Sequence, residues 1–182
     1  MPNMEYEAEV NPKFSPNAKV IINSIQRDAV TPDGVSLFNT FMGNLNEELD
    51  EDILEAADKN GVLEIVCEGE IKEDNGRIVL KYLENADLLA DWVTTVSFDI
   101  NDPNIITVER SGAMSHALVI DQGVRQFSVY TTPYGPFEMC VYGKKVSNLM
   151  TANGGSMVLD YTVELKGMTA QRTTMTIEVI KK

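Results

Sequence analysis

Hydrophobic and polar residues alternate along most of the chain after residue 61. In the clearest stretch, 62–72, Leu63, Ile65 and Cys67 share one face and alternate with Glu64 and Glu68. A period of two is typical of a β-strand with one buried face and one solvated face. The Asp-Asn-Gly sequence at 74–76 then favours a tight hairpin turn into a return strand. This part of the chain is therefore predicted to be an antiparallel sheet.

The same pattern, broken by short turns, predicts nine or ten strands. Besides the hairpin around 74–76, the expected strands are 18–27, 93–100, 105–110, 114–120, 125–131, 137–146, 157–165 and a last one that ends near 179. Short turns make neighbouring strands antiparallel, and a long meander leaves open edges unless it closes on itself. We therefore predict an all-β fold, an antiparallel meander that closes into a barrel of about 8–10 strands. A two-sheet sandwich is the alternative, but its crossovers are longer than the links found here.

One segment has a helical period instead. Apolar residues recur at helical spacing at Leu49, Ile53, Leu54 and Ala57, with acidic residues around them. We predict one short acidic helix at about 46–59, within an insert, 29–61, that follows the first strand. Residues 1–17 contain prolines and no clear period, so they are predicted to form a mobile N-terminal arm. The remainder, 18–182, is predicted to be a single domain.

The composition fits one globular domain. The chain has 182 residues, 43% hydrophobic and 24% charged, and a domain usually has about 100–200 residues. No run of about 18 apolar residues exists, so no membrane span is predicted. The first 16 residues lack the basic and apolar regions of a secretory signal. We expect Cys67 and Cys140 to be free thiols, although one disulfide stays open, and we expect a cytoplasmic location.

The charge balance limits the choice of partners. Acidic residues outnumber basic ones by 28 to 15, which gives a formal net charge of −13. Nucleic-acid binding normally uses clustered Lys and Arg, and here only the pairs Lys144–Lys145 and Lys181–Lys182 occur. We therefore expect no nucleic-acid partner. The acids are densest at 46–60, a segment that would suit a basic protein partner.

Two motifs resemble those of a known family. The first is Glu109-Arg110-Ser111-Gly112 followed by Met114, and the second, roughly 20 residues later, is Tyr130-Thr131-Thr132-Pro133-Tyr134-Gly135. Together with the strand pattern over 18–180, they resemble the YwiB-like family of small bacterial proteins, a domain of unknown function. The resemblance implies a lipocalin-like (calycin-type) barrel. It implies no catalytic residue.

Arg110 and His116 are the first two candidate ligand-binding residues. His116 alternates in phase with Leu118 and Ile120, and Arg110 with Val108, so both are expected to point into the barrel. The charge state of a histidine is easily tuned, and an arginine can bind a carboxylate or phosphate through two hydrogen bonds. The structural alternatives are a hydrogen-bonded core histidine and an arginine held in an ion pair.

Tyr130 and Tyr134, at the predicted Thr-Pro-Tyr-Gly corner, complete the candidate set. Aromatic rings near barrel ends usually plug them, and Tyr134 between Pro133 and Gly135 is favoured as a corner lock over a catalytic phenol. No metal or cofactor is expected. The chain has no Cys-x-x-Cys or His-x-Glu spacing, and 56–67 lacks carboxylates at the two ends of a calcium loop.

Three functional hypotheses follow. In the first, the barrel binds a small apolar or amphipathic ligand inside, with Arg110 and His116 as polar anchors. In the second, a filled barrel is a protein-interaction module that uses the acidic insert. In the third, the protein is a hydrolase or isomerase that depends on His116, the only histidine. No nucleophile–base–orienter set can be assembled around His116, so no catalytic residue is assigned.

Overall fold

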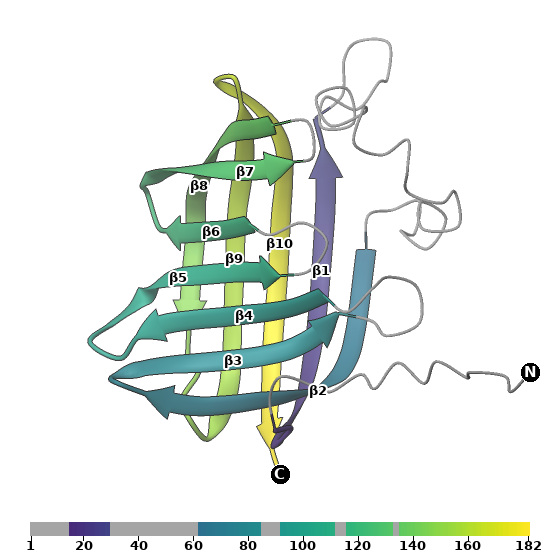
Figure 1. Ribbon diagram of the computed structural model, residues 1–182, viewed down its shortest axis with the longest axis vertical. Helices are drawn as coiled ribbons and strands as arrows, with labels where there is room; N and C mark the ends of the chain where they lie inside the picture. Colours follow the sequence, from purple (N-terminus) through teal and green to yellow (C-terminus); the bar gives the residue numbers. More distant parts are fainter. Residues whose placement is uncertain (1–14, 30–61, 85–91, 112–115, 133–134) are drawn as a thin grey trace, which may run out of the picture.

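The computed structural model describes residues 15–29, 62–84, 92–111, 116–132 and 135–182 (Figure 1). The described residues form ten strands and no helix. The strands are β1 (Ala18–Asp28), β2 (Val62–Asp74), β3 (Arg77–Glu84), β4 (Trp92–Asp99), β5 (Asp102–Ser111), β6 (His116–Asp121), β7 (Arg125–Thr132), β8 (Gly135–Asn148), β9 (Gly154–Leu165) and β10 (Met168–Lys181). The predicted acidic helix at about 46–59 lies outside the described residues. Most of the predicted arm, 1–17, lies outside them too.

All ten strands belong to one antiparallel sheet in the order β6-β5-β4-β3-β2-β1-β10-β9-β8-β7. Strands that follow one another in sequence are neighbours in the sheet, except β6 and β7, which stand at its two ends; β1 in addition pairs with β10 and thereby joins the two ends of the chain. Strands β6 and β7, at the two ends of this order, also contact each other. The prediction of an antiparallel meander that closes into a barrel is confirmed, with one incomplete seam between β6 and β7.

The sheet folds into two crossed layers (Figure 1). Strands β1, β10, β9 and β8 follow the long axis, and β3 to β7 run across them. Strand β2 belongs to both layers, because residues 62–69 pair with β1 and residues 69–74 pair with β3. Gly69 lies where these pairings meet, and a Cβ there would lie 2.6 Å from Cγ2 of Val20. A glycine is therefore required where β2 passes from one layer to the other.

The seam between β6 and β7 is closed at one point by β8. The backbone N–H of Gly123 donates to the carbonyl of Gly143 (2.8 Å), and the N–H of Val146 donates to Oε1 of Gln122 (3.0 Å). A Cβ on Gly143 would lie 2.3 Å from the carbonyl oxygen of Asp121. The absence of a side chain at 143 therefore lets the end of β6 approach β8 and complete the wall.

The two ends of the barrel are built differently. At one end, which we call the turn end, tight turns join β2 to β3, β4 to β5 and β6 to β7. At this end Asn17 and Ile71 exchange two hydrogen bonds, at 2.9 and 2.8 Å, and the N–H of Lys182 donates to the Asn17 carbonyl. At the other, the loop end, the links are 30–61, 85–91, 112–115, 133–134 and the β9–β10 turn. The described part of the chain contains no helix that is long and apolar enough to cross a membrane.

The core fills the turn-end half of the barrel. One row of inward residues crosses five strands in register: Ile71, Leu80, Val96, Val108 and Leu118. All five are buried, with at most 8% of their surface exposed. The facing layer contributes Val20, Ile22, Met157, Leu159, Ile177 and Val179. This half is therefore a packed apolar core rather than a container.

Candidate functional site

The next row of inward residues toward the loop end is polar. Across the same five strands the ladder aligns Gly69, Tyr82, Thr94, Arg110 and His116. Tyr82 and Thr94 are buried, and Arg110 and His116 are half-buried. Two of the predicted site residues, Arg110 and His116, are thus direct cross-strand partners, so their side chains are neighbours on one face of the sheet. Both lie on the inner face, as their phase predicted.

This pair carries one positive charge at neutral pH. Burial, and then the charge of Arg110, lower the pKa of His116 to about 4. His116 is therefore a neutral imidazole at pH 7, able to donate one hydrogen bond and accept another. An arginine stays charged at any physiological pH. The row therefore presents one fixed cation flanked by neutral hydrogen-bonding groups.

The facing layer adds hydroxyl groups to the same half of the interior. Ser24 on β1 and Thr173 on β10 are each 1% exposed. They are diagonal neighbours, because Ser24 pairs with Met175 and Thr173 lies two residues before Met175 on the same face. Within the described residues, neither hydroxyl oxygen has a hydrogen-bond partner, and the same holds for Ser128 on β7. Buried hydroxyls without a partner are rare, since leaving one unsatisfied costs about 1–3 kcal/mol.

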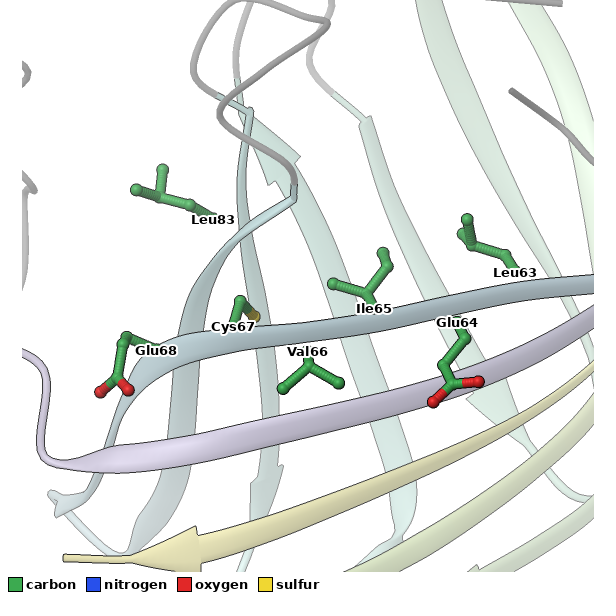
Figure 2. Close-up of a pocket in the computed structure, with 7 residues that line it drawn as sticks. All are labelled: Leu63, Glu64, Ile65, Val66, Cys67, Glu68 and Leu83. Carbon is green, nitrogen blue, oxygen red and sulfur yellow. The ribbon is translucent and has the colours of Figure 1, made fainter. Parts of the chain in front are cut away.

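A hollow of about 520 Å³ adjoins this half of the interior (Figure 2). It forms where β2 has left β3, because 62–68 have β1 alone as a strand partner among the described residues. Figure 2 shows Leu63, Ile65 and Cys67 on the side of β2 that Leu83 of β3 also faces. Ile65 and Cys67 pack against the core, so the hollow reaches the barrel interior. Glu64, Val66 and Glu68 form its remaining lining.

The hollow, the polar row and the two hydroxyls all lie toward the loop end of the barrel. Ser24 is the ladder partner of Leu63, which lines the hollow. On β3, Leu83 lines the hollow, whereas Tyr82, the residue before it, faces the barrel interior in the polar row. Because neighbouring strands lie about 4.8 Å apart, Arg110 on β5 is about 10 Å from β3.

The carboxylates of the described ion pairs lie on the outer face of the barrel, not on the inner face. Arg125 forms two hydrogen bonds with Glu164, at 3.1 and 3.2 Å, and Arg172 forms two with Asp160, at 3.0 and 2.7 Å. The hydrogen bond from Arg172 also lowers the pKa of Asp160. None of the buried polar side chains in the described residues is a carboxylate.

The chain can be placed in a family at this point. A family model described as a domain of unknown function, DUF1934, matches residues 49–177. The chain belongs to the DUF1934 family. Its fold is similar to the crystal structure of the ywiB protein from Bacillus subtilis, with a TM-score of 0.64, 17% sequence identity and 92% of each chain covered. The expected YwiB-like resemblance is therefore confirmed, and at this identity the likeness shows the fold alone. A search of curated proteins found no match.

In this DUF1934 barrel, the other two predicted site residues are less well defined. Tyr130 lies in β7, where its backbone pairs with Phe137. The structure describes its backbone and not its side chain. Tyr134 lies outside the described residues. Both cysteines are free, as predicted. Among the described side chains, no three His, Cys, Asp or Glu come together as a metal ion would need.

Ser24, Thr173 and Tyr82 of this DUF1934 chain are not among the site residues predicted from the sequence. Ser24 is in phase with Val20 and Ile22, and Thr173 with Met175 and Ile177, so each is a hydroxyl residue among apolar ones on the inner face. That mismatch is the signal that could have identified them. It becomes informative once the register shows that Ser24 is the ladder partner of Leu63, which lines the hollow, and that Thr173 is a diagonal neighbour of Ser24.

Proposed function

We propose that the barrel binds a small apolar or amphipathic molecule in its loop-end half. The observation that carries this proposal is the pair of buried hydroxyls, Ser24 and Thr173, for which the described residues offer no hydrogen-bond partner; Ser24 is also the ladder partner of Leu63, which lines the hollow. A bound molecule or water held with it would satisfy them and would remove the cost of burying them alone. A packed interior without a ligand gives no reason to keep two such groups together.

Two further features support the proposal. The hollow of about 520 Å³ has a size typical of small-molecule sites, which are mostly apolar with a few placed polar groups. Leu63, Ile65 and Leu83 supply apolar lining, and Arg110 and His116 supply polar groups on the same inner face. This division suits a molecule with an apolar part and a polar part.

Native mass spectrometry of gently purified protein, before and after denaturation, tests the proposal. We expect a reproducible added mass that disappears on unfolding. Replacing Cys67 with Phe narrows the hollow and should reduce the added mass, whereas Ile25→Phe, on the outer face of β1, should leave it unchanged. The bare chain mass in native conditions, with no binding of added amphiphiles, would contradict the proposal.

The other hypotheses remain predictions. The acidic segment 46–60, proposed as a contact for a basic partner, lies outside the described residues. For the hypothesis of a hydrolase or isomerase that depends on His116, the described contacts identify no nucleophilic side chain. The cytoplasmic location likewise remains a prediction.

A further inference from the structure

We infer that the chain forms a two-fold symmetric dimer through one patch on the outer face of β7 and β8. The patch consists of Arg125, Phe127 and Val129 on β7 and of Tyr142 and Glu138 on β8. Strands β1, β10 and β9 separate it from β2 and the hollow. The inference is therefore independent of the proposed function.

The centre of the patch is a pair of exposed apolar side chains on β7. Phe127 is 71% exposed and Val129 60%, and between them lies Ser128, whose hydroxyl is buried. Because side chains alternate along a strand, Phe127 and Val129 share the outer face. No other aromatic side chain in the described residues is exposed. An exposed phenyl ring beside an exposed valine is typical of the centre of a protein–protein contact, where aromatic residues are enriched.

The ladder arranges the charges of the patch evenly about Phe127. Two residues before it, Arg125 pairs with Tyr142, and two residues after it, Val129 pairs with Glu138. The guanidinium of Arg125 lies over the Tyr142 ring, 4.6 Å from the ring centroid, so a positive charge is located on that side of Phe127. The exposed carboxylate of Glu138 lies on the other side. A cation and an anion thus flank an apolar centre at equal separations along the strands.

The positive side of the patch is already ordered in the single chain. Nε and Nη2 of Arg125 donate to the two carboxylate oxygens of Glu164, at 3.1 and 3.2 Å. The guanidinium has more N–H donors than these two contacts use. Nζ of Lys144, 6.0 Å from the centroid of the Tyr142 ring, adds a second positive charge. A carboxylate that arrives over Tyr142 therefore meets a fixed cation, and little side-chain entropy is lost on binding.

These positions fit a second copy of the same chain. Consider a two-fold axis that lies between two outer faces and crosses β7 at Phe127, so that the facing strands are antiparallel. It places Phe127 against Phe127 of the second copy, and Glu138 of each copy opposite Arg125 and Tyr142 of the other. Every contact occurs twice, as an isologous interface requires, and sheets that pack face to face keep their strands within about 30°. The patch is thus complementary in charge to its own rotated image, which selects a second copy as its partner.

Sedimentation equilibrium of the full-length protein, from about 2 to 200 µM, tests the inference. Salt of about 0.15 M screens the repulsion between two chains that each have a net charge of −13. We expect a monomer–dimer equilibrium with a roughly micromolar dissociation constant, as is usual for a small interface. Phe127→Glu should raise that constant at least 10-fold, because it brings two carboxylates together at the centre. Leu149→Glu is the matched control at another exposed apolar residue, 75% exposed, and should leave the constant unchanged.

Glu138→Lys tests the antiparallel arrangement, since it places a lysine opposite Arg125 of the other copy. It should raise the dissociation constant about 3- to 10-fold. Glu109→Lys, the same charge reversal at an exposed residue of β5, should have a smaller effect. All four variants change exposed side chains, and circular dichroism checks that they fold. A protein that stays monomeric at 200 µM overturns the inference, as does a dimer that neither Phe127→Glu nor Glu138→Lys weakens. A dimer weakened by Phe127→Glu alone overturns the antiparallel pairing of charges.

Discussion

Arg110 on β5 lies directly across the ladder from His116 on β6, and both side chains are on the inner face of the barrel. The link between their strands, 112–115, is short, so the sequence itself brings the cation close to the only histidine. Their proximity has an electrostatic consequence. A second positive charge beside Arg110 is unfavourable, which, after burial, is the other reason that the pKa of His116 is lowered to about 4.

The first prediction is a pH dependence of stability that comes from His116. Its folded pKa of about 4 lies below the usual value of 6.5, so the unfolded chain binds a proton here before the folded one does. The stabilising contribution is therefore complete above about pH 6.5 and is lost as the pH falls toward 4. We expect it to be of the order of 1–3 kcal/mol. Urea unfolding at pH 7.5 and pH 4.5 measures it.

His116→Gln is the control for this prediction, because the variant has no group that titrates there. Its loss of stability between pH 7.5 and pH 4.5 should be smaller than that of the wild type by the contribution of His116. The effect of Asp160, whose pKa is lowered by Arg172, falls mainly below this window, because its usual value is 3.8. An NMR titration showing the imidazole half-protonated near pH 6.5 would contradict the expectation.

The strands and the inward direction of Arg110 and His116 were accessible from the sequence because a period of two reports which residues share a face. Which residues face one another across neighbouring strands is known only from the ladder register of the structure. The period of β2 continues without interruption through 62–74, yet this strand leaves one layer and enters the other at Gly69. The hollow lies where β2 leaves β3, and at that point a Cβ on Gly69 would lie 2.6 Å from Cγ2 of Val20, a residue almost fifty positions away. Local pattern carries no information about such a contact.

The second prediction concerns the hydroxyl of Ser24. Since it is buried without a partner among the described residues, Ser24→Ala should leave the free energy of unfolding of the ligand-free protein unchanged or raise it by up to about 1 kcal/mol. Ser97→Ala is the matched control, because the Ser97 hydroxyl accepts a hydrogen bond from Nη2 of Arg77 at 3.0 Å. That variant should lose about 1 kcal/mol. Chemical denaturation of both compares them, and equal losses would show that Ser24 has a partner in solution.

The third prediction concerns the seam closed by β8. Gly143→Ala would place a Cβ 2.3 Å from the carbonyl oxygen of Asp121, so the backbone must shift. We expect a loss of about 3 kcal/mol in the free energy of unfolding. Gly76→Ala is the comparison, since nothing lies within 4 Å of its Cβ and the cost is mainly its φ of +78°, about 1 kcal/mol. A Gly143→Ala variant as stable as Gly76→Ala would mean that the end of β6 does not approach β8 this closely.

The fourth prediction uses the two thiols to report where a ligand lies. Cys67 is half-buried and lines the hollow, whereas Cys140 is buried and its pKa is raised, chiefly by burial. Because the thiolate is the reactive form, iodoacetamide at pH 8 should modify Cys67 at least about 10-fold faster than Cys140 in the native protein. Saturating dodecanoic acid should then slow modification of Cys67, as the tail occupies the hollow. Peptide mass spectrometry after timed quenching measures both rates.

Cys140 serves as the internal reference in that experiment, since a general loss of flexibility would slow both thiols and a local block would slow Cys67 alone. If Cys67 keeps its full rate while calorimetry shows the acid bound, the tail lies elsewhere, and the hollow beside β2 is not the site.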